Sequence, residues 1–194
     1  MRISMTTLIA GALAAYAGTA SAQQSTTVAV IEISEKGSGA PLGTVVFTDT
    51  PHGLAIDPKL KGLPPGPHGF HVHENPSCAA AAQDGKMVPG LAAGGHYDPK
   101  GTKAHRGPHQ HDGHLGDLPP LVADKDGAAS AKLLAPRLKV ADLRGRSLII
   151  HANGDNFDDK PQPLGGGGGR IACGVFDVKI ANSAARRDPA ATRP

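Results

Sequence analysis

Residues 69–73 read Gly69-Phe70-His71-Val72-His73, so apolar side chains alternate with histidines along this stretch. Alternation with a period of two is typical of a β-strand, in which successive side chains point to opposite faces. His71 and His73 would then leave the same face of one strand, close enough to meet a single ion. The stretch therefore predicts a strand with one apolar face and one histidine face.

The same period of two recurs along the chain and indicates its fold class. We expect strands at residues 26–33, 43–47, 53–56, 69–73, 129–133, 147–151 and 171–180. No segment has a sustained helical period, and Gly- and Pro-rich loops separate the strands, which favours an all-β sandwich or barrel. Two long loops, at residues 74–121 and 152–169, are rich in Gly, Pro, His and Asp. Loops of this length in a compact domain are usually functional.

The beginning of the chain has the character of a targeting segment. Arg2 is followed by a short apolar stretch at about residues 8–17 and then by Ala20-Ser21-Ala22. This pattern predicts a signal peptide at residues 1–22, cleaved before Gln23. The apolar stretch is too short for a good membrane span, so we expect an exported protein without a membrane anchor. The competing interpretation is a buried N-terminal helix.

The rest of the chain has the length of one domain, which we place at residues 23–180, and we expect residues 181–194 to form a disordered tail. The formal net charge is +3, of which Arg2 supplies +1 and the residues after Ile180 supply +2, so the domain itself is neutral. The chain has no Trp, two Tyr and four Phe. A neutral domain with few aromatic side chains is not expected to bind nucleic acid.

Histidines and carboxylates recur in the two long loops and at the strand ends beside them. Beyond His71 and His73 they include His96, His105, His114, Asp117, His151 and Asp155. Imidazole is a ligand shared by zinc and copper, and a carboxylate suits zinc better than Cu(I). The set is large enough for two metals of different character.

The chain has two cysteines, Cys78 and Cys173. Export makes a disulfide between them plausible, and such a bond would close a loop of nearly a hundred residues, worth roughly 4 to 5 kcal/mol on the chain-entropy model. The alternative is a pair of free, buried thiols.

Four motifs in order, together with the cysteine pair, resemble the copper/zinc superoxide dismutases, and specifically their bacterial periplasmic branch. The motifs are Gly69-Phe70-His71-Val72-His73-Glu74, Gly94-Gly95-His96-Tyr97-Asp98-Pro99, His114-Leu115-Gly116-Asp117-Leu118-Pro119 and GGGGGRIACG at residues 165–174. The resemblance extends over about residues 26–179. It implies an eight-stranded Greek-key β-barrel, also described as a sandwich, an architecture of which this family is itself a standard example.

The resemblance also implies a role for each residue singled out above. Copper would be bound by His71, His73, His96 and His151, and zinc by His96, His105, His114 and Asp117, with His96 bridging the two ions. Asp155 would link His71 to His105, Arg170 would guide the substrate to copper, and Cys78 and Cys173 would form the family's disulfide.

The implied function is that of an oxidoreductase in the periplasm: dismutation of superoxide to dioxygen and hydrogen peroxide, which protects the cell envelope. Copper would be the redox metal, because zinc has no redox change to offer. The expected catalytic residues are Arg170 and His96, and the protein would act as a monomer or a homodimer. One alternative is a non-catalytic periplasmic copper/zinc-binding protein on the same fold. A structural adhesion module would leave the ligand positions unexplained.

Several polar residues fall outside this assignment. His109 and His111 lie beside the expected zinc ligands, and a different register would place one of them on zinc instead of His105. We expect both to be exposed loop residues, and His52 and His68 to be ordinary surface or loop residues. Lys86, in the loop after Cys78, is a candidate helper in substrate steering.

Overall fold

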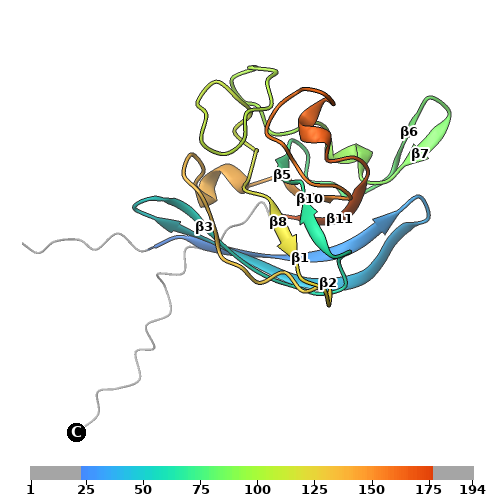
Figure 1. Cartoon of the computed structure of the whole chain (residues 1–194), viewed down its shortest axis with the longest axis horizontal. Helices are drawn as coiled ribbons and strands as arrows, with labels where there is room; N and C mark the ends of the chain where they lie inside the picture. The colour runs from blue at the N-terminus through green and yellow to red at the C-terminus, as the bar shows by residue number, and fades with distance from the viewer. Residues whose placement is uncertain (1–22, 177–194) are drawn as a thin grey trace, which may run out of the picture.

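The computed structural model describes residues 23–176 as a chain of strands joined by loops (Figure 1). The strands are β1 (Ser25–Ser34), β2 (Gly37–Thr50), β3 (Gly53–Leu60), β4 (Gly66–His68), β5 (Phe70–His73), β6 (Ala81–Gln83), β7 (Lys86–Val88), β8 (Leu121–Ala123), β9 (Leu133–Ala135), β10 (Ser147–His151) and β11 (Arg170–Val175). Three short 3-10 turns, η1 (Leu91–Ala93), η2 (Val140–Leu143) and η3 (Leu164–Gly166), complete the elements. Within residues 23–176 no helix has the length and apolar character needed to cross a membrane.

Seven of the strands form one antiparallel sheet in the order β5-β10-β11-β1-β2-β3-β9. Only Gly69 separates β5 from β4, and β4 pairs with β8, so β4 and β5 act as one interrupted strand that extends the sheet to eight strands. The sheet curls on itself (Figure 1). Strand β11, the last in sequence, returns to lie between β10 and β1, the kind of return connection that defines a Greek key. The all-β, eight-stranded fold class expected from the sequence is confirmed.

The core lies inside the curled sheet and is built by the expected alternation. Along β1 the core residues Val28 and Val30 are buried, and between them lies the exposed Ala29. Phe47 on β2 meets Phe176 edge to face, with ring centroids 5.2 Å apart. Such a pair adds about 0.5–1.5 kcal/mol beyond the area that it buries.

Strands β5 and β10 depart from this alternation because every one of their residues is buried. Phe70 and Val72 of β5 belong to the core, whereas His71 and His73 lie on the opposite face. The two long loops cover that outer face (Figure 1). The predicted histidine face is therefore buried under loops and not exposed to solvent.

A disulfide between Cys78 and Cys173 fixes the first long loop to β11, which confirms the pairing expected from the sequence. The two Cα atoms are 5.7 Å apart, and the cysteines are 95 residues apart in the sequence. The bond lies beside Ile33, Ala93 and Ile149, which form a small apolar cluster on the outer side of the sheet.

The strand predictions differ from the structure in a few places. The prediction for 147–151 matches β10, but the strand expected at 129–133 is wrong: β9 spans Leu133–Ala135, and Ala129 forms only an isolated bridge to Leu60. Strand β8 and the β6–β7 hairpin were not predicted, because three-residue strands inside polar loops have no visible period. The expected signal peptide, the tail at residues 181–194 and the end of the strand at 171–180 lie outside the described residues.

Candidate metal centre

Strands β5 and β10 bring three histidines together on the outer face of the barrel. They pair antiparallel, with Ile149 opposite His71 and Ser147 opposite His73, and His151 ends β10. The register of β10 against β11 shifts between Ile150 and His151. Such an irregularity re-aims the side chain beside it. A single bridge between His73 and His96 adds the first loop histidine to the group.

The first cluster consists of His71, His73, His96 and His151, all buried, with one ligand atom of each lying within 4.8 Å of the others. One ring nitrogen in three of these residues is fixed by a hydrogen bond: His71 Nε2 donates to Asp155 (2.7 Å), His73 Nδ1 to the Gly94 carbonyl (3.0 Å) and His151 Nδ1 to the Gly168 carbonyl (3.0 Å). The opposite nitrogens, together with Nε2 of His96, are buried without a hydrogen-bond partner. Partners of this kind orient the imidazoles that bind metals.

The second cluster surrounds one oxygen of Asp117. The Nδ1 atoms of His105, His96 and His114 lie 3.0, 3.1 and 3.4 Å from Asp117 Oδ1. A tetrahedral zinc ion with bonds of about 2.0–2.2 Å would hold its ligand atoms about 3.3–3.5 Å apart. The other oxygen, Asp117 Oδ2, accepts hydrogen bonds from the backbone N–H groups of Arg106 and Gly107, both at 3.2 Å.

Asp155 lies between the two clusters. Its Oδ2 accepts a hydrogen bond from His71 Nε2 at 2.7 Å and its Oδ1 accepts one from His105 Nε2 at 2.8 Å. The backbone N–H of Phe157 also donates to Oδ1, at 2.7 Å. The loop of residues 152–169 thereby connects a histidine of β5 to a histidine of the other long loop.

Burial keeps the first cluster neutral. Burial, reinforced by the neighbouring His96, holds the pKa of His71 and of His73 well below the usual value. Burial lowers the pKa of His96 as well, and lowers that of His151 to about 4. At neutral pH these rings therefore present lone pairs, which is the form that binds metals.

In the second cluster, contacts between histidines and carboxylates outweigh the effect of burial on the pKa values. Burial alone would lower the pKa of His105, but the Asp117 carboxylate, 3.0 Å from its Nδ1, and its hydrogen bond to Asp155 outweigh burial and raise the pKa to about 9. Burial would likewise raise the pKa of Asp117, but contacts with His105, His114 and His96 hold it well below its usual range. The buried carboxylate is therefore an anion, and a divalent cation among these residues would be compensated by it.

Arg170 begins β11 and is held beside the first cluster by backbone carbonyls. Its guanidinium donates to the carbonyl oxygens of Gly90 and Gly94, the latter at 2.7 Å. Gly94 thus accepts hydrogen bonds from both Arg170 and His73. Burial lowers the pKa of Arg170.

The remaining histidines are placed differently from one another. His109, His111 and His52 are exposed, as expected. The expectation for His68 is wrong, because its side chain is 1% exposed. Its Nδ1 lies 2.8 Å from the carbonyl oxygen of His151, and its Nε2 lies 2.7 Å from the carbonyl oxygen of Pro64. The buried His68 ring therefore connects the backbone at residue 64 to the backbone of His151.

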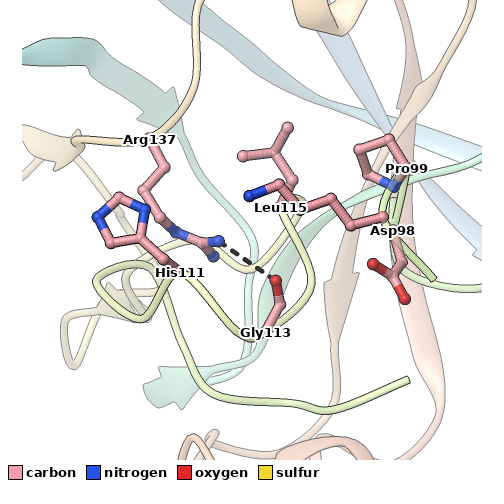
Figure 2. A pocket seen from close by; sticks show the side chains of 7 residues that line it. Asp98, Pro99, His111, Gly113, Leu115 and Arg137 are labelled. Atoms are coloured by element: carbon pink, nitrogen blue, oxygen red, sulfur yellow. Dashed lines mark hydrogen bonds between the residues drawn. The ribbon is translucent and has the colours of Figure 1, made fainter. Parts of the chain in front are cut away.

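One cavity lies next to the second cluster. It measures about 240 Å³ and is lined by Asp98, Pro99, Lys100, His111, Gly113, Leu115 and Arg137 (Figure 2). Arg137 reaches from this cavity to the loop of residues 105–114, and sequence reasoning missed it. A single arginine after a short strand has no pattern that could have identified it.

A family model described as copper/zinc superoxide dismutase matches residues 42–176, more than half of the chain. The chain belongs to the copper/zinc superoxide dismutase family. Its fold, its two clusters of metal-ligating side chains and its disulfide agree with this membership. The expected enzyme class, a superoxide dismutase that uses copper and zinc, is thereby confirmed.

Relatives within this family are similar over most of the chain. The superoxide dismutase [Cu-Zn] of Brucella abortus biovar 1 is 55% identical over 155 residues, which cover 79% of this chain and 89% of the relative. The structure of a Cu/Zn superoxide dismutase from Brucella abortus has a TM-score of 0.78 at 55% identity and covers 79% of this chain and 100% of its own. The solution structure of the monomeric copper, zinc superoxide dismutase from Salmonella enterica has a TM-score of 0.70 at 51% identity, covering 78% of this chain and 98% of its own.

Proposed function

We propose that the two clusters are the catalytic centre for superoxide dismutation in this chain. Copper would be bound by His71, His73, His96 and His151, and zinc by His96, His105, His114 and Asp117. The observation that carries the proposal is the set of ring nitrogens that are buried without a hydrogen-bond partner, one in each of these six histidines. An orphaned buried nitrogen is costly, and a bound metal ion removes that cost.

His96 is the bridging ligand in this assignment. Its Nδ1 lies 3.1 Å from Asp117 Oδ1 in the second cluster, and its Nε2 belongs to the first and has no partner. One ring thus presents a nitrogen to each metal.

Proximity alone leaves one choice open in the zinc set, because His71, His96, His105 and Asp117 also have ligand atoms within 4.8 Å of one another. We assign His114, not His71, to zinc. Nε2 of His71 is bonded to Asp155, which leaves one nitrogen, the buried and unpartnered Nδ1, and we assign it to copper. Nδ1 of His114 is buried, unpartnered and 3.4 Å from Asp117 Oδ1.

Two superoxide ions and two protons yield dioxygen and hydrogen peroxide. Bound copper supplies the one-electron redox change, and zinc, which has none, supplies charge and geometry. With zinc bound at Nδ1, His96 would carry a proton on Nε2 when that nitrogen is free, and would deliver it to the reduced product. Its Nδ1, fixed on the Asp117 side, keeps the ring in place while the proton moves.

Arg170 guides the substrate. Superoxide is a small anion with little shape, so selectivity depends on charge and size, and superoxide dismutases are themselves a standard example of electrostatic steering. The carbonyls of Gly90 and Gly94 hold the guanidinium in one orientation beside His73. Since the domain is neutral overall, we expect the steering to be local. Lys86 lies exposed on the β6–β7 hairpin and stays a predicted helper.

The organisation of the whole chain is also part of the proposal. We place a signal peptide at residues 1–22, the dismutase domain at residues 23–180 and a tail at residues 181–194, with the periplasm as the compartment. The disulfide supports an oxidising compartment. Mass spectrometry of the protein recovered from a periplasmic extract should find Gln23 at the N-terminus.

A monomer is the oligomeric state to test first, by sedimentation, because one relative is described as monomeric.

The decisive experiment follows superoxide decay directly with protein loaded with copper and zinc, alongside Arg170→Ala. We expect fast decay that requires copper and that slows, with a weaker dependence on ionic strength, when Arg170 is lost. Arg170→Lys should recover part of the rate, because it keeps the charge and loses the paired donors. Tight binding of both metals without catalysis would instead identify a non-catalytic metal-binding protein on this fold.

A further inference from the structure

We propose that Arg137 is a positioning residue for the zinc site, which it organises through the backbone of the ligand loop. The inference rests on the zinc assignment made above. Arg137 lies between β9 and η2, outside the loops that carry the zinc ligands.

Four carbonyl oxygens of one loop converge on this guanidinium. Nε donates to Pro108 at 2.9 Å, Nη1 to Gly113 at 3.3 Å, and Nη2 to both Gly107 at 3.1 Å and His114 at 2.5 Å. The bond to Gly113 is drawn in Figure 2. The acceptors come from both ends of the segment 107–114, so the planar fork gathers that segment into a closed loop. A lysine has one charged point and could not reach all four in a fixed geometry.

Two of these carbonyls lead directly to the zinc set. His114 is itself an assigned ligand, and its carbonyl accepts from Arg137 while its Nδ1 faces Asp117 Oδ1. The peptide N–H of Gly107 donates to Asp117 Oδ2 at 3.2 Å, and the Gly107 carbonyl accepts from Arg137. Arg137 therefore fixes the backbone that carries one ligand and the donor that orients another.

The base of Arg137 is anchored in the barrel. Leu138, the next residue, is 1% exposed and belongs to the core, and Pro136 follows directly after β9. The zinc loop has no strand or helix of its own between residues 94 and 120. Isolated backbone bonds, such as Val72 N to the Gly116 carbonyl at 2.9 Å, attach its two ends to β5, and Arg137 attaches the segment 107–114 between them.

Removal of Arg137 would change zinc affinity in opposite directions if the residue acted through its charge and if it acted by holding the loop. A guanidinium near a divalent cation repels it, so removal of Arg137 would raise zinc affinity if only its field mattered. If Arg137 holds the loop, its removal lowers zinc affinity. Loss of an interaction that orients metal ligands typically costs 10–100-fold in metal affinity.

The cavity beside Arg137 provides a route to chemical rescue. Arg137 lines this space of about 240 Å³, so that truncation to alanine enlarges a cavity that already exists. A free guanidinium ion can then occupy the vacated position and bind the same carbonyls. A general loss of stability would not be reversed in this way.

The test titrates metal-free protein with Zn²⁺ against a chromophoric chelator, and with Co²⁺ as a spectroscopic replacement for zinc. We expect Arg137→Ala to weaken Zn²⁺ binding by about 10–100-fold and to distort the visible Co²⁺ bands. Arg137→Lys should lie between it and the wild type. Low-millimolar guanidinium should restore part of the affinity of Arg137→Ala and leave the wild type unchanged.

Lys100→Ala is the matched control, because Lys100 is exposed and lines the same cavity, so the variant removes a positive charge there and leaves Arg137 in place. It should not lower zinc affinity. Unchanged or higher affinity in Arg137→Ala, or a loss that guanidinium does not reverse, would overturn the inference. If Arg137→Ala does not fold, Arg137→Lys carries the same comparison. His114→Ala tests the zinc assignment separately from the inference about Arg137. If this variant leaves the Co²⁺ spectrum intact, the zinc assignment itself is wrong.

Discussion

Gly165 lies so close to Asp155 that a Cβ atom on the glycine would be 2.0 Å from the carboxylate Oδ1. That oxygen accepts the hydrogen bond from His105, and the same hypothetical Cβ would be 2.8 Å from His105 Nε2. Gly165 also has a φ of +72°, which a residue with a side chain adopts at a cost. The first glycine of the run before Arg170 is therefore required by the link between the two clusters.

Gly165→Ala should displace Asp155 and weaken metal binding by about 10–100-fold, the usual effect of losing a carboxylate partner of ligating histidines. The backbone strain should also lower the free energy of unfolding by about 1–2 kcal/mol. Metal affinity by chelator competition and urea unfolding measure the two effects separately.

Two neighbours in the same run serve as controls for Gly165→Ala. Gly166 has a φ of +73° and more room, so Gly166→Ala should show the strain without the loss of affinity. A Cβ on Gly169 would meet nothing within 4 Å, so Gly169→Ala should change neither quantity. If all three variants lost metal affinity equally, the contact with Asp155 would not be the cause.

The metal-free protein should be most stable near pH 6.5 and should lose stability both below and above it. The pKa of His151 falls to about 4 on folding, so the unfolded chain binds more protons below pH 6.5 and stability declines as the pH falls from 6.5 to 4. The pKa of His105 rises to about 9, so its stabilisation is complete below pH 6.5 and is lost as the pH rises through 9. Each shift corresponds to at most about 3 kcal/mol.

Urea unfolding of metal-free protein across this range tests both limbs of the profile. His105→Gln should remove the decline at high pH and leave the decline at low pH. A profile that stays flat from pH 6.5 to 9 in the wild type would show that His105 is not held protonated by Asp117 and Asp155.

The sequence predicted the strand-borne part of the site better than the loop-borne part. The period of two identified His71 and His73, and the end of an apolar run identified His151. Both stretches are strands in the structure, β5 and β10. The carbonyl partners of Arg170 and Arg137 have no sequence signal, because they depend on the path of the loop backbone. His68 was misjudged for the same reason: its partners, the carbonyls of Pro64 and His151, meet only in the folded chain.

The disulfide should serve the substrate site as well as stability. Cys78 ties to β11 the loop that carries Gly90 and Gly94, whose carbonyls orient Arg170. The double variant Cys78→Ala/Cys173→Ala should lose about 2–5 kcal/mol of unfolding free energy. At a temperature where it remains folded, its superoxide decay rate should fall while its copper and zinc affinities stay close to those of the wild type.

We expect the rate to fall without a loss of metal affinity because the metal ligands have supports independent of the disulfide. His71, His73 and His151 stand on paired strands, and Asp117 is held by the N–H groups of Arg106 and Gly107. Arg170 also begins a paired strand, but its guanidinium is oriented by carbonyls of the tethered loop, those of Gly90 and Gly94. Hydrogen bonds also brace that loop, among them Gly95 N to Glu74 Oε2 at 3.0 Å and Asn75 N to the Ala93 carbonyl at 2.9 Å. An unchanged rate in the folded double variant would mean that the hydrogen bonds of the loop suffice, without the disulfide, to hold the carbonyls that orient Arg170.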